Sequence, residues 1–81
     1  MRVVTLYGKP GCSLCDEARA VVFEVRSETE FDLREVDVSL DPALNREYGD
    51  RIPVVAVDGE EAFELHVDRG ALRERLARET R

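Results

Sequence analysis

The sequence predicts a small α/β domain with a pair of parallel strands, an antiparallel hairpin and three helices. A β-prone run, an amphipathic helix and a second β-prone run follow one another between residues 3 and 38. This order favours two parallel strands joined by a right-handed crossover. Farther on, Asp58-Gly59 separates two more β-prone runs and predicts an antiparallel hairpin. At 81 residues the chain is expected to form one domain, residues 1–81.

The first half of the chain supplies the parallel unit. Val3–Tyr7 suits a short buried strand, and glycine and proline residues at positions 8, 10 and 11 are expected to break it. An amphipathic helix then begins near Cys12. Phe31–Val38 is the second predicted strand. The apolar residues of the helix recur at helical spacing: Leu14, Ala18, Val21, Val22 and Val25.

The second half carries clear start and stop signals. Asp41-Pro42 predicts the start of a short helix that runs to Tyr48, and Gly49 is the residue type that most easily takes the left-handed conformation at a helix end. Val54–Val57 and Ala62–Leu65 are the predicted strands of the hairpin. Asp68 is expected to cap a last helix. One side of this helix carries arginines, and the other side is apolar and consists of Ala71, Leu72, Leu76 and Ala77.

Charge and hydropathy exclude several classes of protein. The net charge of −6 argues against non-specific binding to nucleic acid or to an anionic membrane. No segment approaches the ~20 apolar residues of a membrane span, and the first residues lack the apolar core of a signal peptide. We therefore expect a cytoplasmic monomer. The uneven spread of acidic and basic residues is interpreted as solvated faces of opposite sign.

The two cysteines, Cys12 and Cys15, lie where the first strand gives way to the helix. The first N–H groups of a helix lack intrahelical partners and form the positive end of its dipole, which favours a thiolate over a thiol. Cys12 is therefore expected to be the nucleophile. Helical residues three apart have Cβ atoms about 5–6 Å apart, so a small adjustment lets the two sulfurs close a disulfide.

Three interpretations of this cysteine pair remain: a catalytic dithiol, half of a metal site, or two residues that fill space. A structural zinc site needs four ligands, and His66 is the only other soft ligand in the chain, so no closed metal site is expected within one monomer. A metal ion or iron-sulfur cluster shared between molecules is the minority alternative. The strand-to-helix context favours the catalytic dithiol.

Lys9 is the only lysine beside eleven arginines, and it lies three residues before Cys12. It can stabilise a Cys12 thiolate or bind a carboxylate of a thiol substrate, although a solvated loop lysine is an equally good interpretation. The carboxylate of Asp16 acts in the opposite direction, because it repels a neighbouring thiolate.

Four other residues have ordinary interpretations. His66 has no sequential pairing with a cysteine and is interpreted as a polar loop residue before the last helix. Tyr7 and Tyr48 are expected to pack with their hydroxyls at the surface. For Pro53 the base rate alone favours a trans peptide bond, since only about 5–6% of X-Pro bonds in folded proteins are cis.

Taken together, Tyr7–Cys15, Ile52-Pro53 before a β run, the Asp58-Gly59 turn and the Asp68-capped helix resemble the glutaredoxin branch of the thioredoxin superfamily. The resemblance covers nearly the whole chain and is closest to the small glutaredoxin-like proteins. It implies a thioredoxin-like fold, in which a four-stranded mixed sheet of order 2-1-3-4 is flanked by three helices.

The resemblance also implies roles for individual residues. Cys12 corresponds to the nucleophile, Cys15 to the resolving cysteine, and Lys9 to the basic residue before the motif. Pro53 corresponds to a cis-proline that faces the cysteines, so we expect a cis Ile52-Pro53 bond against the base rate. The Ile52 backbone would then face outward and pair with an extended substrate peptide.

The sequence departs from that family at two places. Ser13-Leu14 stands where Pro-Tyr is common, and Leu65-His66-Val67 stands where Gly-Gly precedes the last helix. Part of glutathione can be bound by each of three groups: Lys9, the Ile52 backbone and the helix start at Asp68. The side chains of His66 and Val67, however, should narrow the groove that would hold glutathione. Protein disulfides are therefore expected to be preferred over glutathione mixed disulfides.

The expected function is that of an enzyme, a thiol-disulfide oxidoreductase that reduces protein or glutathione mixed disulfides. Cys12 attacks a disulfide and Cys15 then attacks the Cys12 sulfur to release the reduced substrate. No bound organic cofactor is required. The reductant is expected to be glutathione or a thioredoxin reductase-like protein. The alternative is a non-catalytic docking module or a carrier of a metal ion or iron-sulfur cluster.

Overall fold

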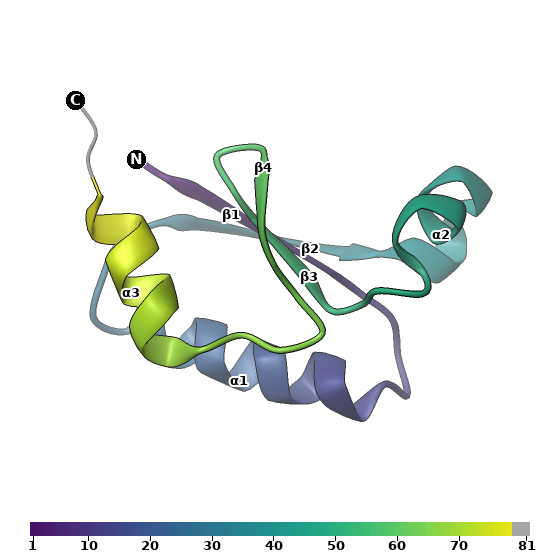
Figure 1. Ribbon diagram of the computed structural model, residues 1–81, viewed down its shortest axis with the longest axis horizontal. Coiled ribbons are helices and arrows are strands. Elements are labelled where there is room, and N and C mark those ends of the chain that lie inside the picture. The colour runs from purple at the N-terminus through teal and green to yellow at the C-terminus, as the bar shows by residue number, and fades with distance from the viewer. Residues whose placement is uncertain (79–81) are drawn as a thin grey trace.

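A computed structural model describes residues 1–78 and contains one sheet with the strand order β2-β1-β3-β4 (Figure 1). β1 (Val3–Gly8) runs parallel to β2 (Asp32–Asp37) and antiparallel to β3 (Val54–Val57). β4 (Glu60–Glu64) pairs antiparallel with β3. The expected mixed sheet of order 2-1-3-4 is therefore confirmed.

Three α-helices accompany the sheet: α1 (Ser13–Arg26), α2 (Pro42–Tyr48) and α3 (Arg69–Ala77). Helices α1 and α3 lie next to each other along one side of the strands, whereas α2 lies at the opposite end of the molecule from α3 (Figure 1). A single 3₁₀ turn, η1 (Val38–Leu40), leads from β2 into α2. Within residues 1–78, no helix is long and apolar enough to cross a membrane.

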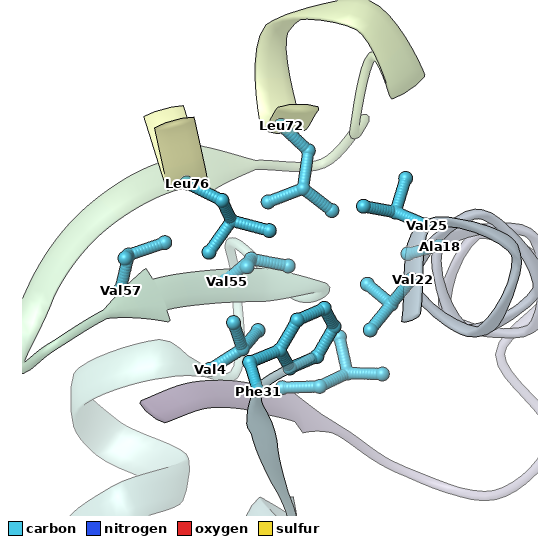
Figure 2. Close-up of a cluster of buried hydrophobic side chains, with 10 residues drawn as sticks. Val4, Ala18, Val22, Val25, Phe31, Val55, Val57, Leu72 and Leu76 are labelled. Atoms are coloured by element: carbon cyan, nitrogen blue, oxygen red, sulfur yellow. The ribbon is translucent and has the colours of Figure 1, made fainter. Parts of the chain in front are cut away.

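The larger of two groups of buried side chains fills the space between the sheet, α1 and α3 (Figure 2). We call it the central cluster. Nine of its side chains come from the helical positions of α1 and α3 and from alternate positions of β1 and β3, because a strand directs every second side chain to the same face. The tenth, Phe31, lies just before β2. Its members are Val4, Leu6, Ala18, Val22, Val25, Phe31, Val55, Val57, Leu72 and Leu76.

Helix α3 begins as predicted and is tied to α1. The Asp68 carboxylate accepts a hydrogen bond from the Ala71 N–H at 2.8 Å, which satisfies one unpaired donor of the first turn. Leu72 and Leu76 are buried, but the predicted core residue Ala77 is exposed. Two arginines of α3 form ion pairs with carboxylates of α1 and of the turn that follows it: Arg69 with Glu24 at 2.7 Å, and Arg73 with Glu28 at 2.6 Å.

The predicted hairpin turn is confirmed, since Asp58 and Gly59 have φ values of 52° and 87°. The predicted ends of two strands were wrong by one residue. Val38 belongs to η1 instead of β2, and Leu65, with a φ of 69°, lies after β4. The pairing of β3 with β4 is irregular between Val55 and Ala56, where the register of β4 shifts.

Two glycines have roles that differ from the prediction, because neighbouring atoms approach them closely. Gly8 is the last residue of β1 and does not break it. Gly49 has a φ of −54°, so it is not left-handed. A Cβ on Gly49 would lie 2.4 Å from the carbonyl oxygen of Asn45, so lack of space at the end of α2 explains this glycine.

Candidate active site

Cys12 lies at the N-terminal cap of α1. The left-handed Gly11, with a φ of 78°, precedes it, and Cys12 has extended backbone angles of −105° and 111°. Its sulfur accepts a hydrogen bond from the Cys15 N–H at 3.2 Å, in the place where a serine or aspartate oxygen usually caps a helix. The Cys12 side chain is half-buried. The Cys12 sulfur is therefore partly accessible and lies beside the first N–H groups of α1.

Cys15 lies in the first turn of α1 and is only 7% exposed. Burial, followed by the hydrogen bond with Cys12, raises the pKa of the Cys15 thiol to about 11. Gly8 makes room for this sulfur, because a Cβ at Gly8 would lie 3.0 Å from the Cys15 Sγ. Cys12, which is half-buried, is the more exposed of the two thiols.

Both cysteines belong to the smaller group of apolar side chains, which we call the cysteine cluster. Its buried members are Cys15, Val38 and Ile52. The Ile52-Pro53 peptide bond is cis, as the resemblance implied. The structure thus brings Ile52 next to Cys12 and Cys15 from a separate part of the chain. The half-buried members are Tyr7, Cys12, Leu44 and Tyr48.

An aromatic and ionic network supports the loop that carries Ile52. The rings of Tyr7 and Tyr48 stack with centroids 4.2 Å apart, and the Arg51 guanidinium lies 5.3 Å from the centroid of the Tyr48 ring. Arg51 also pairs with Glu61 at 2.8 Å and with Glu64 at 3.2 Å. These carboxylates raise the pKa of Arg51. Arg51, the residue before Ile52, therefore contacts both α2 and β4.

Lys9 lies on the other side of the Cys15 sulfur. A pocket of about 280 Å³ opens between the β1–α1 loop, α1 and the end of β2, and both Lys9 and Cys15 line it. Cys12 does not line this pocket. The predicted site residues thus fall into two groups, with Cys12 and Ile52 in the cysteine cluster and Lys9 in the pocket behind Cys15.

The loop between β4 and α3 approaches the cysteines from the side of α1. The N–H of Leu65 donates to the Pro53 carbonyl at 2.7 Å, which ties this loop to the cis-proline. His66 and Val67 line a small pocket of about 90 Å³ together with Leu14 of α1. Asp68 is exposed and caps α3.

The described part of the chain, residues 1–78, contains no group of three or more histidine, cysteine, aspartate or glutamate side chains that could hold a metal ion. Both cysteine sulfurs lie in this part of the chain. Its two sulfurs differ in exposure, which suits a pair in which one sulfur meets the substrate and the other acts second.

Sequence reasoning missed two features of this region. The first is Arg51, whose only local signal was its position directly before Ile52-Pro53. The second is the close packing of Gly8 against Cys15, seven residues later, for which the sequence offered a glycine but no partner. The expectation that Tyr7 and Tyr48 serve packing is confirmed by their stacking.

Comparisons with known proteins agree with this geometry. The chain is 38% identical to the uncharacterized protein Rv0508 of Mycobacterium tuberculosis over 82 residues, which cover 95% of this chain and 84% of that protein. Protein Ne2328 from Nitrosomonas europaea has a similar solved structure, with a TM-score of 0.79 at 27% identity, covering 93% of this chain and 91% of that one.

A thioredoxin variant from Halobacterium salinarum NRC-1 has a TM-score of 0.69 at 26% identity, and the match covers 93% of this chain and 71% of that one. The fold is therefore thioredoxin-like. Residues 3–77 match the glutaredoxin-like domain family (DUF836). Because that match spans the sheet and all three helices, this chain belongs to the glutaredoxin-like domain family.

Proposed function

We propose that this protein is an enzyme that reduces disulfides through the Cys12–Cys15 dithiol. The observation that carries the proposal is the unequal setting of the two sulfurs. Cys12 is half-buried at the helix start, where its sulfur accepts the Cys15 N–H, whereas Cys15 is buried one turn farther on. The family match and the likeness to a thioredoxin support the same activity.

The reaction is two successive thiol-disulfide exchanges. The Cys12 thiolate attacks one sulfur of the substrate disulfide, a bond forms between them, and the other substrate sulfur leaves and takes a proton. Cys15 then loses its proton and attacks the Cys12 sulfur, and the second substrate sulfur leaves as a thiol. The substrate gains two electrons and two protons, and the protein keeps a Cys12–Cys15 disulfide. A dithiol or two thiols from a reductant restore the starting state.

Disulfides of a protein partner are the proposed substrates in preference to glutathione mixed disulfides. The Ile52 side chain packs beside both cysteines, so an extended segment that pairs with the Ile52 backbone would bring its own sulfur near Cys12. In the loop between β4 and α3, His66 and Val67 line a pocket of only about 90 Å³ against α1. Pockets for small molecules usually begin near about 300 Å³, so this one is small for a tripeptide.

The physiological setting belongs to the same proposal. The reductant is glutathione or a thioredoxin reductase-like protein, and the enzyme acts as a cytoplasmic monomer. A cytosolic compartment keeps dithiols reduced and so allows repeated turnover.

The test compares two substrates and two sources of electrons. Reduction of insulin disulfides and reduction of a glutathionylated peptide are each followed with thioredoxin reductase and NADPH, or with glutathione. We expect the wild type to prefer insulin. Cys12→Ser should abolish turnover on both substrates, whereas Cys15→Ser should hold protein partners as mixed disulfides on Cys12. Turnover of the glutathionylated peptide alone, with glutathione alone, would contradict the substrate preference.

A metal content measurement on the purified protein separates this function from that of a carrier of metal ions or clusters. A colourless, metal-free protein with disulfide reductase activity agrees with the proposal. Stoichiometric iron or zinc bound through Cys12, together with no turnover on any disulfide, would favour the carrier.

A further inference from the structure

The loop between β4 and α3 contains a leucine in a strained conformation. Leu65 has a φ of 69°, and the N–H of His66 donates to the Glu64 carbonyl at 2.7 Å. A hydrogen bond between residues two apart, around a central φ of about +75°, defines the rare and strained type of γ-turn. Leu65 is the central residue of this turn, where a bulky side chain is unusual.

Neighbouring groups hold Leu65 in this conformation. Its own N–H donates to the Pro53 carbonyl at 2.7 Å, which attaches the turn to the residue after Ile52. Strained backbone persists only where the surrounding structure fixes it, and such positions cluster at active sites and ligand-binding sites. Glycine takes these angles without strain, so the turn itself does not need a leucine. The side chain of Leu65 therefore needs a separate explanation.

Burial in a core does not supply that explanation. Leu65 is 40% exposed and belongs to neither of the two clusters. It lines the pocket of about 90 Å³ where its loop runs beside α1 (Figure 1), and we call this the Leu65 pocket. Its two polar lining residues, Glu17 and His66, are exposed. The other lining residues are apolar: Leu14, Ala18 and Val21 of α1, and Leu65 and Val67 of the loop.

The volume and the place of the Leu65 pocket limit what can occupy it. Small-molecule sites usually begin near about 300 Å³, so this pocket suits a single side chain. Contact with its apolar walls favours an aliphatic side chain over a polar one. Leu14 lies two residues after Cys12, and Leu65 is bonded to Pro53. A peptide segment that passes Cys12 and Ile52 could therefore place a neighbouring side chain in the pocket.

We propose that the Leu65 pocket binds an aliphatic side chain of the protein substrate, next to the cysteine whose disulfide Cys12 attacks. This inference deepens the proposed oxidoreductase function and rests on it. Leu65 is then a specificity-determining residue. The strained turn holds its apolar side chain where the substrate passes, so disulfides with aliphatic neighbours are preferred over disulfides with polar ones.

Two peptide disulfides test this preference. They carry either leucine or serine on both sides of the half-cystine and are otherwise identical. Single-turnover reduction by the reduced protein is quenched with acid and followed by chromatography. Each rate constant is divided by the rate constant with which dithiothreitol reduces the same peptide, which removes differences in intrinsic reactivity. We expect the leucine peptide to react about three- to tenfold faster than the serine peptide.

Substitutions of Leu65 separate specificity from structure. Leu65→Asn keeps a residue type that tolerates left-handed angles but removes the apolar side chain, so the preference for the leucine peptide should disappear. Leu65→Met restores an apolar side chain and should restore the preference. Phe23→Gln is the matched control, since Phe23 is 41% exposed on α1 and does not line the pocket. Circular dichroism checks that each variant is folded.

The contact is also tested without turnover. Each peptide is attached to Cys12 of the Cys15→Ser variant through a disulfide, formed from a peptide with a thiopyridyl leaving group that any accessible thiol accepts. We expect the NMR signals of the Leu14, Val21 and Val67 amides to differ between the leucine and serine complexes. These differences should be smaller when Leu65→Asn is added.

The two proposals fail in different ways. If the protein reduces insulin but shows no preference between the peptides, or if the tethered peptides give the same amide signals, the Leu65 inference is wrong and the oxidoreductase function stands. If leucine-specific signals appear but the wild type reduces no disulfide, the proposed function is wrong and the apolar contact beside Cys12 stands. An equal loss of rate with both peptides in Leu65→Asn would assign Leu65 a structural role and overturn the inference.

Discussion

The central cluster and the cysteine cluster use the same sheet but are built differently. The central cluster has ten buried side chains and is sealed by α1 and α3. The cysteine cluster has three, and its other members are half-buried. Deep burial of apolar surface is the main source of folding stability, so the end of the sheet beneath α1 and α3 carries most of it.

The difference shows how a small protein keeps a reactive end. A sulfur that must meet a substrate cannot be sealed in a core, and near Cys12 the structure replaces apolar burial by contacts at the surface. These contacts are the stack of Tyr7 on Tyr48 and the ion pairs of Arg51. They hold the Ile52 loop in place without covering the Cys12 sulfur. Four predictions test this division of roles.

The largest expected effect is on the central cluster. Leu72 is fully buried, so Leu72→Ala should lower the free energy of unfolding by about 2–5 kcal/mol. Leu44 is half-buried in the cysteine cluster, and Leu44→Ala should cost less than half as much. Urea unfolding followed by circular dichroism measures both. Equal losses from the two substitutions would show that the clusters contribute equally.

The next prediction concerns the acidity of Cys15. Because burial raises its pKa from 9.0 to about 11, the neutral thiol stabilises the fold fully below pH 9 and this contribution is lost as the pH rises through 11. In Cys12→Ser the rate of Cys15 alkylation should therefore still be rising between pH 9 and pH 10, with circular dichroism to show that the fold persists. An alkylation rate that reaches a plateau below pH 9 would contradict the raised pKa of the buried Cys15 thiol.

Arg51 should affect substrate binding more than chemistry. Arg51→Ala removes the attachment of the Ile52 loop to Glu61 and Tyr48, and we expect KM for a protein disulfide to rise about three- to tenfold while kcat changes little. Arg46→Ala is the matched control, since Arg46 is an exposed arginine of α2 without an ion pair in the described chain. An unchanged KM in Arg51→Ala would show that the attachment of the Ile52 loop by Arg51 does not affect substrate binding.

The smallest effect is expected for the exposed ion pair between Arg73 of α3 and Glu28 in the turn after α1. The Arg73 guanidinium holds the pKa of the Glu28 carboxyl below its ordinary value of 4.5. The stability from this pair is therefore present above pH 4.5 and lost as the pH falls through the lowered pKa. Glu28→Gln should shift the urea midpoint slightly at neutral pH and low salt, and not at all in acid or in high salt. A shift as large as that of Leu72→Ala would contradict this ranking.

The sequence by itself determined the elements whose signals are local. The capping Asp68, the Asp58-Gly59 turn and the cysteines at the start of α1 were all predicted correctly, because each depends on atoms within about one turn of helix or one hairpin. The strand order and the cis Ile52-Pro53 bond came instead from the resemblance to a family. Local signals also placed the boundaries of strands only to within one or two residues. Val38 and Leu65 lie outside their predicted strands, and β4 begins at Glu60, two residues before its predicted start at Ala62.

The tertiary structure alone decided which residues surround the two sulfurs. Tyr7 meets Tyr48, Arg51 meets Glu61, and Lys9 lies in one pocket with residues of β2, although separate parts of the chain supply them. Such contacts depend on how the strands order and how α2 returns to the sheet, which no periodicity records. The same holds for Gly8, whose missing side chain matters only because packing brings the Cys15 sulfur against it. Local patterns therefore identified the cysteine pair proposed to react, whereas packing between distant segments made the exposure of its two sulfurs unequal.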